Sequence, residues 1–365
     1  MNALKFSTIA LRLAAAAGLT AALAFSATPA SMTLGKAELK SAGQLAFGPD
    51  GILFVGDSMG ASIVAIDTGD RTPARKAGKI DIKGLNQKIA AMLGAAPDQI
   101  LISDVVVNPI SKTAYISVSR GRGPDAVPVI LRADGAGKIT EVSLDNVKHS
   151  MVSLPDAPQA KEGRANPRLE TITHMAYVNG NVIVAGLSNE EFSSSLRSIP
   201  FPFQQAGKGA SIEIYHGSHG RFETNSPVRT FVAYNLKSQP YILAAYTCTP
   251  LVSIPVSELK AGAKVKGTTI AELGNRNRPL DMIVYNKGGQ DYILMANSSR
   301  GVMKMPAMGI DGFQPVLAHT EKAGVNYETI ADLKGVQQLD KLDESNALML
   351  IDNAGSLDLQ TIPLP

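Results

Sequence analysis

Several polar side chains occupy corresponding places at the beginnings of β-compatible segments. Three repeats can be aligned on the asparagines that begin their turns, Asn108, Asn179 and Asn286. This alignment places Ser103, His174 and Asp281 at equivalent positions, and Asp104 directly follows Ser103. Carboxylate oxygens are ligands for calcium, and an imidazole near a carboxylate is suited to general acid–base catalysis. His174 and Asp281 are therefore candidate catalytic residues, and Asp281 and Asp104 are candidate ligands for a divalent metal ion such as calcium. The alternative is a hydrated channel whose polar groups bond to one another and to water.

Two guanidinium groups precede Asp281 in the sequence. Arg276 and Arg278 could hold an anionic ligand through paired hydrogen bonds, or they could neutralise the nearby carboxylate. Asn297, which ends the next apolar segment, is a further candidate for ligand binding. The residues themselves do not decide between an anion site and a neutralised carboxylate.

The single cysteine, Cys248, excludes a disulfide within the chain. Its apolar neighbours favour a buried, inert thiol, and the alternative is a reactive thiol that binds a ligand or forms a redox or copper site. The five histidines of the chain are few for a transition-metal site built from several imidazoles.

A repeated pair of apolar runs supplies the scaffold for these side chains. In each copy a turn rich in Gly, Asn or Asp joins the two runs, as at Pro49-Asp50-Gly51. Six copies cover residues 44–57, 103–119, 174–186, 229–247, 281–297 and 336–352. With a third and a fourth strand, such a pair forms one blade of a β-propeller. The sequence therefore predicts an all-β protein with six blades; seven blades, with a degenerate copy between Ala210 and Val228, is the alternative.

Two segments outside the repeats also carry predictions. Residues 86–93 are rich in helix-forming side chains and predict a helix after the first blade. The ring must be closed by a strand from elsewhere in the chain. We expect residues 31–39 to pair with the last segment, residues 357–362.

The first 30 residues are typical of a secretory signal peptide. Lys5 and Arg12 precede an apolar stretch at residues 13–25, which is short for a membrane span. The small residues Thr28 and Ala30 favour cleavage after Ala30. A retained membrane anchor is the alternative. We therefore predict a signal peptide at 1–30, a single propeller domain at 31–365, and a periplasmic or secreted protein.

Charge and composition exclude several classes of partner. Removing Lys5 and Arg12 from the 35 basic residues leaves 33 against 32 acidic ones, and no basic stripe for nucleic acid is present. The mature chain has no apolar stretch long enough to span a membrane. It also lacks the G-x-S-x-G, H-E-x-x-H, P-loop, C-x-x-C-H and EF-hand motifs. The predicted partner is a small-molecule ligand or another protein.

The segment LAFGPDGILFVGD at 45–57, followed by SIVAID at 62–67, resembles the blade unit of NHL-repeat propellers and of gluconolactonase-like (regucalcin-like) six-bladed propellers. In the gluconolactonase-like family, Glu, Asn and Asp side chains of inner strands hold a divalent metal on the central axis. The resemblance implies that Asp281 is the metal-binding aspartate and that Glu170 is the candidate glutamate. The superfamily includes lactone hydrolases, metal binders and interaction modules.

These observations predict an exported binding or interaction propeller, with a polar central-channel site for a small ligand or a metal ion. The alternative is a metal-dependent hydrolase similar to lactonases and esterases, in which a metal held by Asp281 polarises a carbonyl and His174 moves the proton. A redox or copper site at Cys248 is a further alternative.

Overall fold

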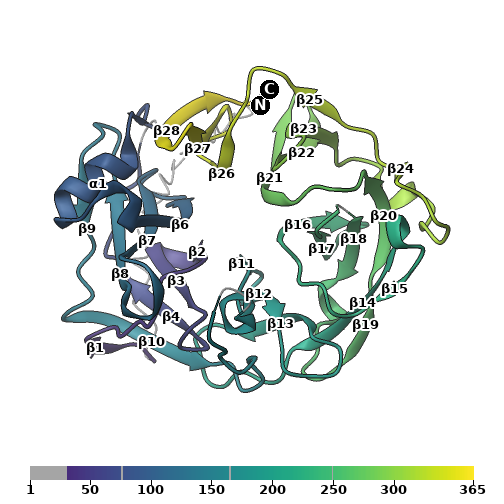
Figure 1. Ribbon diagram of the computed structural model, residues 1–365, viewed down its shortest axis with the longest axis horizontal. Coiled ribbons are helices and arrows are strands. Elements are labelled where there is room, and N and C mark those ends of the chain that lie inside the picture. The colour runs from purple at the N-terminus through teal and green to yellow at the C-terminus, as the bar shows by residue number, and fades with distance from the viewer. Residues whose placement is uncertain (1–30, 75–76, 164–165, 249) are drawn as a thin grey trace, which may run out of the picture.

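The computed structural model describes residues 31–74, 77–163, 166–248 and 250–365, so the predicted signal peptide lies outside the described residues. Figure 1 shows β-sheets arranged in a closed ring, with helix α1 (Leu85–Leu93) on its outer side. The described residues form six sheets, which confirms the prediction of a six-bladed β-propeller. Within these ranges, no helix combines the length and the apolar character needed to cross a membrane.

The strands of each sheet follow one another from the axis outward. The first sheet contains β2 (Leu45–Phe47), β3 (Ile52–Asp57), β4 (Ser62–Asp67), β10 (Val147–Ser153) and β1 (Thr33–Gly35). The second contains β6 (Ile100–Val107), β7 (Ala114–Arg120), β8 (Val127–Ala133) and β9 (Ile139–Glu141). The third contains β11 (His174–Val178), β12 (Asn181–Leu187), β13 (Ser194–Pro200), β14 (Ala210–His216) and β15 (Arg221–Glu223), and β19 (Lys264–Lys266) pairs with β14.

The second half of the chain forms the remaining sheets. The fourth contains β16 (Thr230–Leu236), β17 (Gln239–Ala245), β18 (Pro250–Pro255), β20 (Thr268–Leu273) and β24 (Lys322–Gly324). The fifth contains β21 (Pro279–Lys287), β22 (Gln290–Asn297), β23 (Gly301–Pro306) and β25 (Glu328–Ile330). The sixth contains β26 (Val336–Lys341), β27 (Asn346–Asn353), β28 (Ser356–Pro363) and β5 (Asp81–Ile82).

The turn of the clearest sequence repeat shows why these residues form a hairpin. Asp50 and Gly51 both adopt positive φ, at 56° and 73°. Glycine takes this conformation without steric cost, and aspartate tolerates it better than most residues. A Cβ atom at Gly51 would also lie 2.9 Å from the carbonyl oxygen of Asp70. The predicted hairpin therefore depends on this glycine for both its conformation and its packing.

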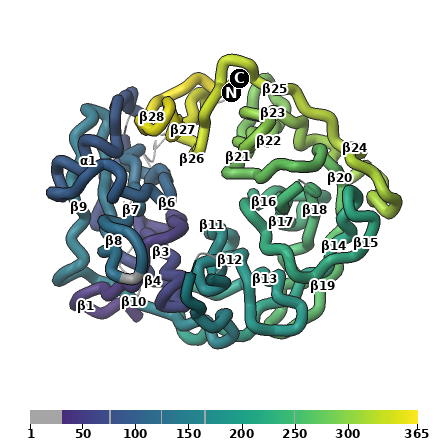
Figure 2. Tube along the Cα trace, viewed as in Figure 1, coloured from purple at the N-terminus to yellow at the C-terminus, as the bar shows by residue number. Residues whose placement is uncertain are grey.

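The blades do not follow one another around the ring in chain order. The inner strand β2 contacts β6 on one side and β11 on the other, and β6 also contacts β26. The inner strands therefore follow the order β6, β2, β11, β16, β21, β26. The first blade of the chain lies between the second and the third, as the colours of Figure 2 show.

This ring order makes the predicted closure wrong. β1 pairs with β10 at the outer edge of the first blade, with Thr33 opposite His149. The last blade is completed instead by β5, where Ile82 lies opposite Leu359 of β28. β5 belongs to the connection between the first and second blades, and that connection passes the last blade because the second blade lies beside it.

The alternative of seven blades is also wrong, and the predicted helix is confirmed. The segment proposed as a degenerate blade forms β14 and β15, which are outer strands of the third blade. β14 pairs with β13, β15 and β19, so it extends an existing sheet. The predicted helix at residues 86–93 corresponds to α1.

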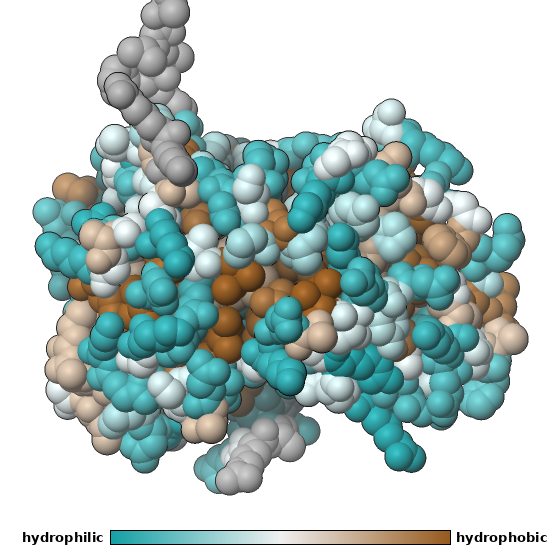
Figure 3. Space-filling model, turned by 90° about the horizontal axis from the view of Figure 1, so that it is seen from above, coloured by the Kyte–Doolittle hydropathy of each residue, from teal (hydrophilic) through white to brown (hydrophobic). Residues whose placement is uncertain are grey.

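The core consists of separate apolar layers between neighbouring blades. The described residues contain six hydrophobic clusters, and each joins the facing sides of two adjacent sheets. On β7, Ala114 and Ile116 face the last blade, whereas Tyr115 between them faces the first blade. Side chains alternate across a strand, so one strand contributes to two layers. Figure 3, which views the ring from its edge, shows hydrophobic residues concentrated at mid-height.

Candidate functional site in the central channel

Three aspartates on inner strands join neighbouring blades at the axis. Asp104 on β6 accepts a hydrogen bond from the N–H of Val105 at 2.9 Å and one from the N–H of Leu45, on the adjacent strand β2, at 2.8 Å. Asp281 and Asp340 bond in the same way, each to the residue that follows it and to a neighbouring inner strand. Each carboxylate thus satisfies two backbone donors, one on its own blade and one on another.

The position of Asp281 in its strand corresponds to Asp104 and not, as the turn asparagines predicted, to Ser103. The register of β6 shifts directly before Asp104, and the register of β21 shifts directly before Asp281. Such a β-bulge changes the direction of the next side chain, which brings both aspartates to the same kind of position. Counting from the asparagines fails because Asn286 is still part of β21, whereas Asn108 follows the end of β6.

The side chain of Gln338 lies between two of these carboxylates. With its amide nitrogen facing the two carboxylates, Gln338 donates hydrogen bonds of 2.9 Å to Asp104 and 3.2 Å to Asp281. In the opposite amide orientation it donates to the carbonyl oxygen of Ser103 at 3.3 Å. The first orientation leaves no acceptor facing an acceptor, so it is the one that the network favours.

Burial makes these aspartates harder to ionise. It raises the pKa of Asp104 to about 7 and that of Asp340 to about 6. Burial, followed by the charge of Asp104, raises the pKa of Asp281 well above its usual range. Backbone hydrogen bonds oppose the change in all three, but desolvation is the larger effect.

The carboxylates do not fit the calcium site that the family resemblance implies. Both oxygens of Asp104 and of Asp281 already accept backbone N–H groups. Glu170 lies elsewhere: it forms an ion pair with Arg229 and lines neither of the two cavities on the axis. The structure therefore brings Asp104 and Asp281 together, each bonded to Gln338, but it does not bring Glu170 to them.

His174 and Asp281 line the same cavity, which has a volume of about 510 Å³, but no hydrogen bond joins them within the described residues. The His174 ring lies edge-on to Phe231, with 4.7 Å between the ring centroids. Burial lowers the pKa of His174 to about 4, although a hydrogen bond to the backbone of Phe231 opposes the shift. A neutral imidazole of such low basicity is a weak general base near pH 7.

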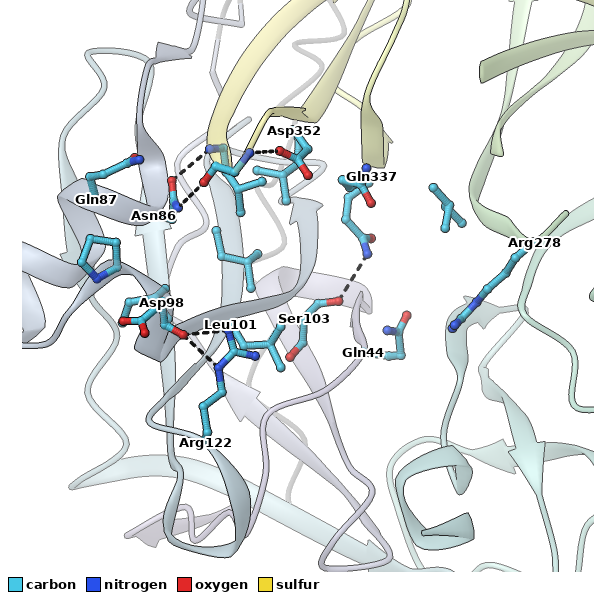
Figure 4. A pocket seen from close by; sticks show the side chains of 18 of the residues that line it. Gln44, Asn86, Gln87, Asp98, Leu101, Ser103, Arg122, Arg278, Gln337 and Asp352 are labelled. Carbon is cyan, nitrogen blue, oxygen red and sulfur yellow. Dashed lines mark hydrogen bonds between the residues drawn. The ribbon is translucent and has the colours of Figure 1, made fainter. Parts of the chain in front are cut away.

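A larger cavity, of about 710 Å³, lies at the face of the ring where the inner strands begin. Figure 4 shows its polar lining, which includes Gln44, Ser103 and Gln337. On one wall, Arg122 donates two hydrogen bonds to the carbonyl oxygen of Asp98, at 2.8 and 2.9 Å. This cavity is large enough for a small-molecule ligand.

Arg278 stands on the opposite wall of this cavity. Its guanidinium end points towards the side on which Gln44 lies (Figure 4). Among the described residues, Arg278 bonds through its backbone N–H to Ser298, and no hydrogen bond or ion pair from its guanidinium group is found. The neighbouring Arg229, by contrast, is held by Glu170 and Thr247. Arg278 is exposed, and partial desolvation, followed by the charge of Arg229, lowers its pKa, whereas the charge of Glu170 opposes the shift.

The other predicted ligand residues lie outside the two cavities. Arg276 is exposed in a turn with φ of 55°. Asn297 is buried. Its amide nitrogen donates to the side chain of Asn277, and its amide oxygen accepts the N–H of Arg300, so both ends of the amide are bonded within the protein. Cys248 is half-buried, less than a buried inert thiol requires, and among the described residues it belongs to no group of candidate metal ligands.

Sequence reasoning missed Asp340, Gln338 and Gln44 as channel residues. Asp340 lies in one of the copies of the repeat that were not aligned on a turn asparagine, so the alignment did not reach it. Nor does its place in the strand reveal it, because Asp281 lies near the beginning of β21 whereas Asp340 lies next to the end of β26. Gln338 and Gln44 show no pattern in the repeat either.

No protein-family model matches the chain, and a search of curated proteins finds no match. Solved structures with a similar course of the chain include a PQQ-bound aldose sugar dehydrogenase from Streptomyces coelicolor, with 13% identity, coverage of 92% of this chain and 100% of that chain, and a TM-score of 0.33. A soluble aldose sugar dehydrogenase from Escherichia coli in the apo form has 12% identity, coverage of 91% and 99%, and a TM-score of 0.33. At these values the likeness does not bear on the activity of this chain.

Proposed function

We propose that this protein is an exported ligand-binding propeller that holds a small, hydroxylated anion in the 710 Å³ cavity at the channel mouth. The observation that carries the proposal is the guanidinium group of Arg278, which faces this cavity without a partner among the described residues. Two other arginines line the cavity, and both already have partners: Arg122 bonds to Asp98, and Arg229 bonds to Glu170.

The electrostatics of Arg278 support an anion over a cation. Arg278 is exposed to solvent, but partial desolvation and the charge of Arg229 lower its pKa against the charge of Glu170, which makes the cation slightly less favourable there than in water. A carboxylate or phosphate group accepting two hydrogen bonds from the guanidinium would offset that cost. The amides of Gln44 and Gln337 and the hydroxyl of Ser103 could bond to the hydroxyl groups of the ligand.

Ligand binding to the variant Arg278→Gln tests the proposal. A panel of small hydroxylated carboxylates and phosphates is screened by thermal shift, and each binder is then titrated by calorimetry. We expect the variant to bind about 10- to 100-fold more weakly, because a hydrogen bond to a charged group contributes about 1.5–3 kcal/mol.

Arg276→Gln is the matched control, since Arg276 is an exposed arginine in the same loop that does not line the cavity. It should bind as the wild type does. If no anion binds the wild type, or if both variants bind with wild-type affinity, the proposed anion site is wrong.

Export and the absence of a membrane anchor in the mature chain belong to the same proposal. Lys5, Arg12 and the apolar stretch that follows support a cleaved signal, with Ser31 as the first mature residue. The mass of the secreted chain would show whether cleavage occurs after Ala30. The hydrolase alternative has less support, since His174 is weakly basic and the aspartate oxygens are bonded to the backbone.

A further inference from the structure

Two histidines and a glutamate gather at the outer hairpin of the third blade, away from the channel. His216 ends β14, His219 lies in the turn, and Glu223 ends β15. One ring nitrogen of each histidine and one oxygen of the glutamate all lie within 4.8 Å of one another.

The hairpin register explains why these side chains meet. His216 pairs with Arg221, and Glu223 lies two residues after Arg221 on the same strand. The side chains of His216, Arg221 and Glu223 therefore lie on one face of the sheet. Diagonal neighbours across an antiparallel pair are within reach of long side chains. The turn 217–219 is closed by Gly220 at a φ of 65°, which brings His219 back over the same face.

Hydrogen bonds already place the candidate ligand atoms near one another. Nδ1 of His216 lies 2.8 Å from one oxygen of Glu223, and Nδ1 of His219 lies 2.7 Å from the other. The two imidazole rings are tilted, with 4.0 Å between their centroids. The side chain of His216 is 3% exposed and that of Glu223 is 8% exposed, whereas His219 is 45% exposed and open to solvent.

Unsatisfied polar atoms at the same turn are a second, independent observation. Nε2 of His216, Oγ of Ser218 and Oε2 of Glu272 are buried and have no hydrogen-bond partner within the described residues. Glu272 lies directly against this turn, because its other oxygen accepts the N–H of Gly217 at 2.6 Å. Buried polar atoms are nearly always satisfied by protein, water or an ion, so a cluster of unsatisfied ones indicates a missing ligand.

We propose that His216, His219 and Glu223 form a binding site for a divalent transition metal of the zinc class. Two imidazole nitrogens and a carboxylate oxygen are a ligand set that zinc prefers, and calcium prefers oxygen alone. Three protein ligands leave a fourth position, which the exposed side of His219 opens to solvent. Arg221 bonds to Glu223 at 3.1 Å but is 73% exposed, so it can move away when the metal binds. This site is separate from the proposed anion site.

Zinc titration of the full chain tests the proposal. The protein is stripped with a chelator, titrated with zinc chloride by calorimetry, and its metal content is measured by mass spectrometry after dialysis. We expect one zinc ion per chain. His219→Ala and Glu223→Gln should each weaken binding about tenfold or more, since the loss of a ligand costs at least as much as the loss of a group that supports one.

His219→Ala is the principal variant because its exposed side chain contributes little to folding, and circular dichroism checks that each variant is folded. His149→Ala is the control: His149 is a half-buried histidine on the outer strand β10 of the first blade, away from the proposed site. The control should bind zinc as the wild type does. The proposal is overturned if the wild type binds no zinc, if neither ligand variant weakens binding, or if His149→Ala weakens binding equally.

Discussion

At the scale of single residues, the aspartates of the channel are best explained as connections between blades. The two oxygens of Asp104 accept N–H groups from two different inner strands, and Asp281 and Asp340 repeat the arrangement. Each therefore fixes the position of one blade relative to another. Their types and approximate places were predictable from the sequence, but this bonding pattern was not, because it depends on strands far apart in the chain.

The raised pKa of Asp104 predicts a pH dependence of stability. Its pKa rises from an ordinary 3.8 to about 7 on folding, so the folded protein binds the proton more tightly than the unfolded chain does. The resulting stabilisation is complete below about pH 4 and is lost as the pH rises to about 7. One pKa unit corresponds to about 1.4 kcal/mol, so the loss should reach a few kcal/mol.

Asp104→Asn cannot ionise and should lack this contribution. We expect the free energy of unfolding of the wild type, relative to that of Asp104→Asn, to decrease between about pH 4 and pH 7. Urea unfolding at a series of pH values measures it. The difference also contains the effect of Asp104 on Asp281, which Asp104→Asn removes, and parallel profiles would show that the Asp104 pKa is not raised.

At the scale of elements, β5 closes the ring although it is very short. Ile82 of β5 is 1% exposed and belongs to the hydrophobic cluster between the last and second blades. The backbone N–H of Ile80 donates to the hydroxyl of Thr361, and the N–H of Gly84 donates to Asp358. These contacts attach a two-residue strand to the outer edge of the last blade.

Truncating Ile82 should therefore destabilise the whole ring. We expect Ile82→Ala to lower the free energy of unfolding by about 2–5 kcal/mol, because the cavity it leaves is fully buried. Leu34→Ala is the control in β1, the strand that the sequence suggested for closure; Leu34 is 64% exposed, and the change should stay within about 0.5 kcal/mol. Urea unfolding compares the two variants, and a larger loss for Leu34→Ala would contradict the observed closure.

At the scale of the whole molecule, each apolar layer belongs to two blades. The last blade shares one layer with the fifth blade and another with the second. A chain lacking that blade would expose both layers to water. No blade is therefore expected to be stable alone.

This sharing predicts the effect of removing the last blade. A chain of residues 31–365 should unfold cooperatively, whereas residues 31–334 should show no cooperative transition or should aggregate. Urea unfolding followed by circular dichroism distinguishes these results. A shortened chain that unfolds cooperatively with the midpoint of the longer one would contradict a closed ring.

The metal candidate shows how local pattern and tertiary contact differ. The spacing of His216, His219 and Glu223 was visible in the sequence, but the small number of histidines counted against a transition-metal site. Only the hairpin register places these side chains on one face, and only packing buries His216 beside Glu272. The sequence could have indicated the hairpin, but not the unsatisfied atoms beneath it.

The sequence by itself determined the strand pairs, the turn at Gly51, the helix α1 and the propeller class, and the structure excluded the seventh blade. These depend on local alternation of apolar residues and on turn chemistry, which neighbouring residues specify. The tertiary structure alone decided the ring order, the closure by β5, the pairing of Glu170 with Arg229 and the isolation of the Arg278 guanidinium group. Those features depend on which distant strands become neighbours. The apolar residues of a strand face do not specify the sheet against which that face packs.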